Sequence, residues 1–143
     1  WRTVPIDRGT KDGMRVDLPV LTTNGLVGRI SAVSYDRSQV VLIGDPNCKV
    51  AAQIVNSSGD MGVIGSSGPF DGSLVEMTHL SKNAALQPGQ DVITSGLGGI
   101  FPEGIPIGKV VDFRQVEYGL YTEARVKLAA DLSALDEVWV LFK

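Results

Sequence analysis

Residues 94–110 read TSGLGGIFPEGIPIGKV, and the fold is most readily predicted from this stretch. It combines five glycines and two prolines with large apolar residues, among them Leu97, Ile100 and Phe101. Flexible linkers pair glycine with serine and other polar residues, whereas a loop of this kind needs special backbone angles and a surface to pack against. We therefore expect an ordered loop between two strands.

A shorter counterpart of this stretch lies early in the chain. Residues 19–30 read PVLTTNGLVGRI. Residues 91–110 repeat the same order: an aliphatic strand end with threonine, a glycine turn, and then aliphatic residues followed by glycine and a basic residue. The second stretch differs by an insert, LGGIFP, at 97–102. The repeat indicates two related β modules in tandem.

Composition excludes several classes of protein. The formal net charge is −3, and the sequence contains no basic stripe of the kind that nucleic-acid binders carry. Cys48 is the only cysteine and His79 the only histidine, so neither an intrachain disulfide nor a metal cluster of cysteines or histidines can form. We predict no cofactor, no metal site and no catalytic residue.

The chain contains 17 glycines and 7 prolines, and no segment keeps a helical period over about twelve residues. We predict an all-β fold of two small tandem β-barrels, with short turns and at most one or two helical turns, because closure removes exposed strand edges. The small, polar stretch from Gly65 to Asp71 predicts the boundary, giving a first barrel at 1–67 and a second at 68–143. A terminal strand can cross to the other barrel.

Five motifs stand in order along nearly the whole chain: DRG with DG within 7–13, NGLVGR at 24–29, DPN at 45–47, the loop at 94–108, and ADL at 130–132. Together they resemble the MreC family of rod shape-determining proteins. The loop motif is specific, whereas the turn motifs alone would be weak. Two departures are local: Asp17 stands where glycine is expected, and Trp139 lies inside the last strand.

The resemblance implies a non-enzymatic scaffold of the bacterial cell-wall elongation machinery, which maintains rod shape by binding and organising peptidoglycan synthases. It implies as partners a class B penicillin-binding transpeptidase, MreD and the MreB system, with self-association of the full-length protein. It places the chain on the periplasmic side of the inner membrane, as a soluble fragment that begins at Trp1. The membrane helix and coiled coil of the family would precede it.

Two rival classes of function stay open. Ser95, on the glycine-rich turn, and His79 could belong to a degenerate or active chymotrypsin-like two-barrel hydrolase, which needs both side chains within hydrogen-bond reach. Against this, His79 falls in the same module as Ser95, whereas such proteases take the two residues from different barrels. A peptidoglycan-binding domain would need an exposed aromatic platform, which the aromatic residues spread along the chain do not obviously supply.

The loop insert supplies the candidate partner-binding residues, namely Leu97, Ile100, Phe101 and Pro102. Because the first module closes without such an insert, these side chains either fold back as a lid or face a partner. The lid is slightly favoured for Ile100. Phe101 is expected to be the main anchor, because aromatic residues in a fixed backbone contribute most to binding hot spots.

Overall fold

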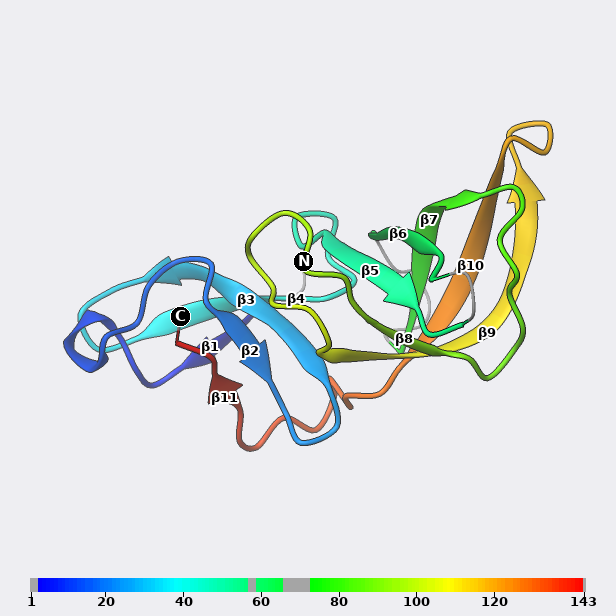
Figure 1. The fold of residues 1–143 in the computed structure, drawn as a ribbon. Coiled ribbons are helices and arrows are strands. Elements are labelled where there is room, and N and C mark those ends of the chain that lie inside the picture. The colour runs from blue at the N-terminus through cyan, green and yellow to red at the C-terminus, as the bar shows by residue number, and fades with distance from the viewer. Residues whose placement is uncertain (1–2, 57–58, 66–72, 143) are drawn as a thin grey trace.

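The computed structural model describes residues 3–56, 59–65 and 73–142 (Figure 1). In these ranges the chain forms eleven strands and one short 3-10 helix, η1 at Thr10–Asp12, which confirms the all-β prediction. The strands are β1 (Thr3–Ile6), β2 (Pro19–Leu21), β3 (Leu26–Val33), β4 (Ser38–Leu42), β5 (Val50–Ile54), β6 (Met61–Ile64), β7 (Leu74–Ser81), β8 (Asp91–Thr94), β9 (Pro106–Val116), β10 (Tyr121–Leu128) and β11 (Trp139–Val140).

Six strands close into a barrel in the order β10-β7-β6-β5-β8-β9, with every neighbouring pair antiparallel. Burial alternates along β10, as expected for a strand in the wall of a barrel: Ala124 and Val126 are buried, whereas Arg125 and Lys127 are exposed. A strand with this period presents one face to the core and the other to water. The barrel interior is filled by fully buried side chains, and its own strands contribute Ile54, Ile64, Met77, Leu80 and Ile107.

The remaining strands form a five-stranded sheet in the order β1-β4-β3-β2-β11. Its hairpin between β2 and β3 turns at Asn24 and Gly25, as the Asn-Gly pair predicts, and the Thr22 N–H donates to the Gly25 carbonyl at 2.9 Å. The sheet covers its own core, which contains Leu18, Val20, Val27, Ile30 and Val40.

The predicted boundary between residues 67 and 68 is wrong, because it does not separate the two sheets. Strands β5 and β6 precede this boundary, yet both belong to the closed barrel. The chain crosses between the two sheets at residues 43–49, where Ile43 and Cys48 are buried in the core of the barrel. The turn at 44–47 looks like an ordinary turn within one module, so sequence gave no sign of the crossing. The predicted connection after Gly65 lies outside the described residues.

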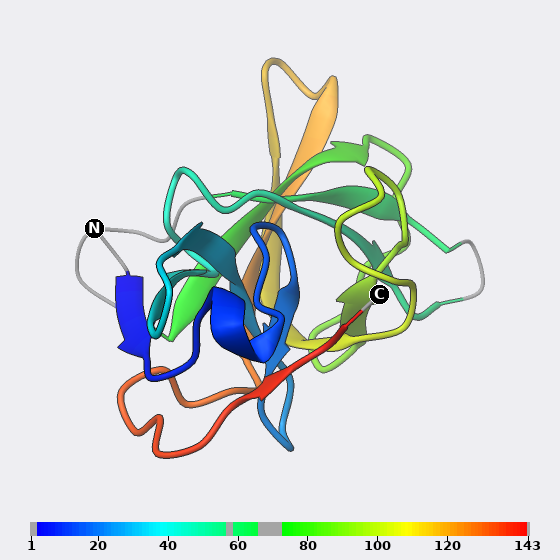
Figure 2. The ribbon, with the colours of Figure 1, turned by 90° about the vertical axis from the view of Figure 1, so that its left-hand side faces the viewer.

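A terminal strand does cross to the other half of the chain, a possibility that the sequence left open. Strand β11 pairs with β2 in the first sheet, with Trp139 opposite Leu21 and Val140 opposite Val20. In Figure 2 the C-terminal segment, coloured red, returns to the N-terminal strands, coloured blue. The two halves are therefore interleaved in sequence, because the first sheet is completed only by the last strand of the chain.

Candidate partner-binding surfaces

The glycine loop, residues 95–105, joins β8 to β9 as an ordered turn. Four of its glycines have positive φ angles, between 76° and 96°: Gly96, Gly98, Gly99 and Gly104. The buried Thr94 hydroxyl joins the loop to the barrel, since it donates to the Pro102 carbonyl at 2.5 Å and accepts from the Ile105 N–H at 2.9 Å. The expected ordered loop is confirmed.

The four predicted partner-binding residues do not lie on one surface. Phe101 is only 4% exposed and belongs to the core of the barrel, and Ile100 packs against that core. Leu97 is 60% exposed, and Pro102, five residues later, is also exposed. The prediction of Phe101 as an accessible anchor is therefore wrong. The positive φ angles around it reverse the chain, so that the loop folds back as a lid and the ring is buried in the core.

Ser95 and His79 do not form a catalytic pair. His79 lies on β7 and Ser95 follows β8, and these strands are separated by two strands in either direction around the barrel. The Ser95 hydroxyl accepts from the Leu97 N–H at 3.4 Å, whereas His79 Nδ1 lies 2.9 Å from the Thr78 hydroxyl. The hydrolase interpretation required both side chains within hydrogen-bond reach, and the barrel keeps them apart.

Cys48 is a core residue rather than a nucleophile. Its side chain is fully buried in the barrel core, and burial raises the pKa of its thiol to about 11. A thiol with this pKa stays protonated at neutral pH, and the thiolate is the reactive form. Among the described residues, no group of three or more histidine, cysteine or acidic side chains could hold a metal ion.

The hairpin between β9 and β10 projects beyond the barrel (Figure 1). Its turn places three consecutive residues in the left-handed region, with φ angles of 52° at Glu117, 57° at Tyr118 and 82° at Gly119. Two backbone bonds of 3.1 Å close the turn, from the Gly119 N–H to the Val116 carbonyl and from the Leu120 N–H to the Glu117 carbonyl. The Tyr118 side chain is fully exposed. No pattern in the sequence indicated this surface.

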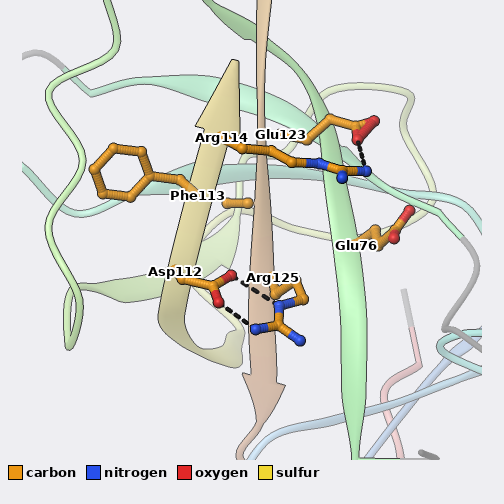
Figure 3. A pocket seen from close by; sticks show the side chains of 7 residues that line it. Glu76, Asp112, Phe113, Arg114, Glu123 and Arg125 are labelled. Carbon is orange, nitrogen blue, oxygen red and sulfur yellow. Dashed lines mark hydrogen bonds and ion pairs between the residues drawn. The ribbon is translucent and has the colours of Figure 1, made fainter. Parts of the chain in front are cut away.

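Below the turn, the outer face of the hairpin is lined by paired charges around a hollow of about 380 Å³ (Figure 3). Arg125 binds both carboxylate oxygens of Asp112, and this contact holds the pKa of Asp112 below its usual value. Arg114 lies 3.5 Å from Glu123. In Figure 3 the Phe113 ring points away from these charges. Both pairs join residues that are directly opposite in β9 and β10, so they hold the hairpin in register.

Among the described residues, no helix has the length and hydrophobicity needed to cross a bilayer.

Comparisons with known proteins identify the family. The sequence model of the family described as "Rod shape-determining protein MreC, barrel core" matches residues 1–142. The MreC of Listeria monocytogenes is 34% identical over 96% of this chain and 47% of its own length. The MreC of Escherichia coli is 32% identical over 97% of this chain and 37% of its own length. The chain thus spans less than half of either relative.

Solved structures give the same result. A structure of MreC from Listeria monocytogenes has a TM-score of 0.91 and 33% identity, covering 97% of this chain and 67% of that one. A complex between penicillin-binding protein PBP2 and MreC from Helicobacter pylori matches in fold, with a TM-score of 0.71 and 23% identity, covering 88% of this chain and 76% of that one. The closed barrel, the interleaved sheet and the match along nearly the whole sequence agree: the chain belongs to the MreC family of rod shape-determining proteins.

Proposed function

We propose that this chain is the barrel core of a non-enzymatic scaffold that maintains rod cell shape by binding and organising peptidoglycan synthases. The observation that carries the proposal is the match of residues 1–142 to the barrel core of MreC, together with a fold that superposes on MreC at a TM-score of 0.91. The separation of Ser95 from His79 supports a role in binding rather than hydrolysis.

The partner best supported is a class B penicillin-binding transpeptidase. A protein of the same fold, the MreC of Helicobacter pylori, is found in a complex with the penicillin-binding protein PBP2. The family resemblance adds MreD, the MreB system and self-association of the full-length protein to the proposed partners. In this proposal the chain lies on the periplasmic side of the inner membrane, where peptidoglycan synthases act.

The exposed edge of the glycine loop is one surface for this partner. Leu97 is 60% exposed on a loop whose backbone is fixed by Thr94 and anchored in the core by Phe101. A large apolar side chain on such a rigid support loses little entropy on binding. Leu97 and Pro102 therefore contact the partner in this proposal, while Ile100 and Phe101 hold the loop on the barrel.

The test is a binding measurement between this chain and the periplasmic part of the class B transpeptidase from the same organism. We expect saturable binding, weakened about fivefold or more by Leu97→Ser. The matched control is Val16→Ser, because Val16 is 53% exposed but lies outside the loop. Absence of binding by the unaltered chain would contradict the proposed partner, whereas equal binding by both variants would contradict only the loop.

A further inference from the structure

The apex of the β9–β10 hairpin carries a group of exposed apolar side chains, which we name the apex cluster: Tyr118, Leu120 and Tyr121. Their side chains are 106%, 61% and 42% exposed. Together they present roughly 400 Å² of surface, since a whole aromatic side chain covers about 150–250 Å². Exposed apolar surface that reaches this size on a monomer is often functional.

The backbone under the apex cluster holds Tyr118 in a conformation that bulky residues rarely adopt. A non-glycine residue with positive φ costs about 1–2 kcal/mol, and here Glu117 and Tyr118 are both in this region. Tyr118 gains no packing in return, because its side chain is fully exposed. A strained and exposed aromatic residue is best explained by a contact that the isolated chain does not make.

The hairpin is built to present this cluster rigidly. The pairs Asp112–Arg125 and Arg114–Glu123 bridge its two strands, and the Tyr121 ring packs edge-on against His79 of β7, with ring centroids 6.2 Å apart. The strand pairing continues to Val116 opposite Tyr121, directly before the turn. A rigid projection loses little conformational entropy when it enters a partner.

Charge and area indicate the kind of partner. The outer face beside the cluster carries three carboxylates, on Glu76, Asp112 and Glu123, against two guanidinium groups. With Glu117 at the turn, this surface is net negative, which opposes an anionic membrane surface and favours a partner with a basic rim. The cluster alone is about half of the roughly 800 Å² that each side of a stable interface buries, so a symmetric contact of two apices would be too small.

We propose that the apex cluster inserts into an apolar socket, edged by basic residues, on a folded protein partner. This inference rests on the proposed function, in that the partner is the class B transpeptidase. It adds a second contact surface, because the glycine loop and the apex lie at opposite ends of β9, separated by roughly 33 Å for a strand of this length at about 3.3 Å per residue.

The decisive variant is Tyr118→Gly, measured for binding to the periplasmic part of the transpeptidase. Glycine accepts the positive φ angle, so this change removes the ring and keeps the turn. We expect binding to weaken about tenfold or more, as for a central aromatic anchor. The matched control is Glu117→Gly, which relieves the same backbone strain one residue earlier and keeps the ring. It should bind within about twofold of the unaltered chain.

Two further variants extend the test. Tyr35→Ser removes a side chain that is 71% exposed on the first half of the chain and should leave binding unchanged. Glu76→Lys reverses a charge on the outer face and should weaken binding and slow association, because the partner's rim is basic. Stronger binding by Glu76→Lys would overturn the basic rim.

Each outcome separates the two proposals. If the unaltered chain binds and Tyr118→Gly binds equally well, the apex proposal is overturned and the proposed function stands. If the unaltered chain does not bind, both are overturned. If Tyr118→Gly changes the sedimentation of the isolated chain, the cluster contacts a second copy of the chain. If Tyr118→Gly abolishes binding to lipid vesicles, the cluster contacts a membrane. Either result would also overturn the proposal.

Discussion

Gly28 and Gly108 occupy the same structural position in the two halves of the chain. A Cβ atom on either glycine would lie 2.0 Å from a backbone carbonyl oxygen of the neighbouring strand, that of Val41 or Lys127. Their strand partners match as well: Val20 and Leu42 flank Gly28, and Val92 and Leu128 flank Gly108. The repeat seen in the sequence is therefore a repeat of three strands, with β2-β3-β4 equivalent to β8-β9-β10.

Because backbone atoms cannot rotate away as side chains do, Gly28→Ala and Gly108→Ala should each lower the free energy of unfolding by about 2–3 kcal/mol. Urea denaturation measures the loss. Gly65→Ala is the control, since a Cβ atom there would meet nothing within 4 Å, and it should change stability by less than about 0.5 kcal/mol. Similar losses of unfolding free energy in all three variants would show that Gly28 and Gly108 are not needed for the close approach of neighbouring strands.

Phe101→Ala should lower the free energy of unfolding by about 3–5 kcal/mol, because it leaves a cavity in the barrel core. Leu97→Ala, four residues earlier on the same loop, should cost less than about 0.5 kcal/mol, because its side chain is exposed. Equilibrium denaturation of both variants compares them directly. Equal stability of the two would mean that the loop does not pack as a lid in solution.

Thr94→Val keeps the shape of a buried side chain but removes both hydrogen bonds that fix the glycine loop. The Pro102 carbonyl and the Ile105 N–H then lose a partner, so the free energy of unfolding should fall by about 1–3 kcal/mol. Thr78→Val is the control, because within the described residues the Thr78 hydroxyl makes just a 3.5 Å contact with the Val63 carbonyl besides its contact with His79. Hydrogen exchange of the Ile105 amide should rise in Thr94→Val alone.

Sequence predicted what local patterns determine. The glycine turns, the Asn24-Gly25 hairpin and the alternation in β10 each follow from a few adjacent residues, so the all-β class and the repeat could be found. The crossing at 43–49 could not, because choosing between the two sheets depends on contacts of Ile43 and Cys48 with distant strands.

The candidate sites show the same limit. Burial of Phe101 depends on how four positive φ angles combine, and exposure of Tyr118 depends on how far β9 and β10 extend beyond the barrel. Glycine in the sequence EYG at 117–119 is typical of a turn. It gave no sign that the turn would carry an aromatic residue clear of the surface.

The pair of Asp112 and Arg125 should make hairpin stability depend on pH. The hydrogen bonds from the arginine lower the pKa of Asp112 in the folded state. The pair therefore stabilises the fold at any pH above the ordinary aspartate pKa of about 3.9, and this stabilisation is lost as the pH falls through the lower pKa of the folded state. Asp112→Asn should thus be less stable than the unaltered chain at pH 7. The difference should shrink toward pH 2 and in high salt, as followed by urea midpoints.

Asp36→Asn is the control for this titration, because Asp36 lies exposed on a turn and forms no ion pair within the described part of the chain. It should follow the pH profile of the unaltered chain. A difference between Asp112→Asn and the unaltered chain that stays constant from pH 7 to pH 2 would mean that the pair does not stabilise the fold through its charges.

Asp17 explains one departure from the family pattern. It stands where the resemblance leads one to expect glycine, and its φ angle is 71°, a left-handed conformation that glycine adopts without strain. Its carboxylate is 3.1 Å from Arg29, which also donates to the Asn47 carbonyl at 2.7 Å. The aspartate is therefore strained where glycine would not be, but it gains an ion pair beside the crossing at 43–49 that glycine could not form.

Asp17→Ala loses the ion pair and keeps the strain, whereas Asp17→Gly loses the ion pair and relieves the strain. Since the left-handed conformation costs a residue with a Cβ atom about 1–2 kcal/mol, Asp17→Ala should be less stable than Asp17→Gly by about that amount. Asp17→Gly should lie within about 1 kcal/mol of the unaltered chain, because the lost pair is partly exposed and worth little. Urea denaturation of the three proteins decides the order, and an alanine variant as stable as the glycine variant would show that position 17 leaves the left-handed region in solution.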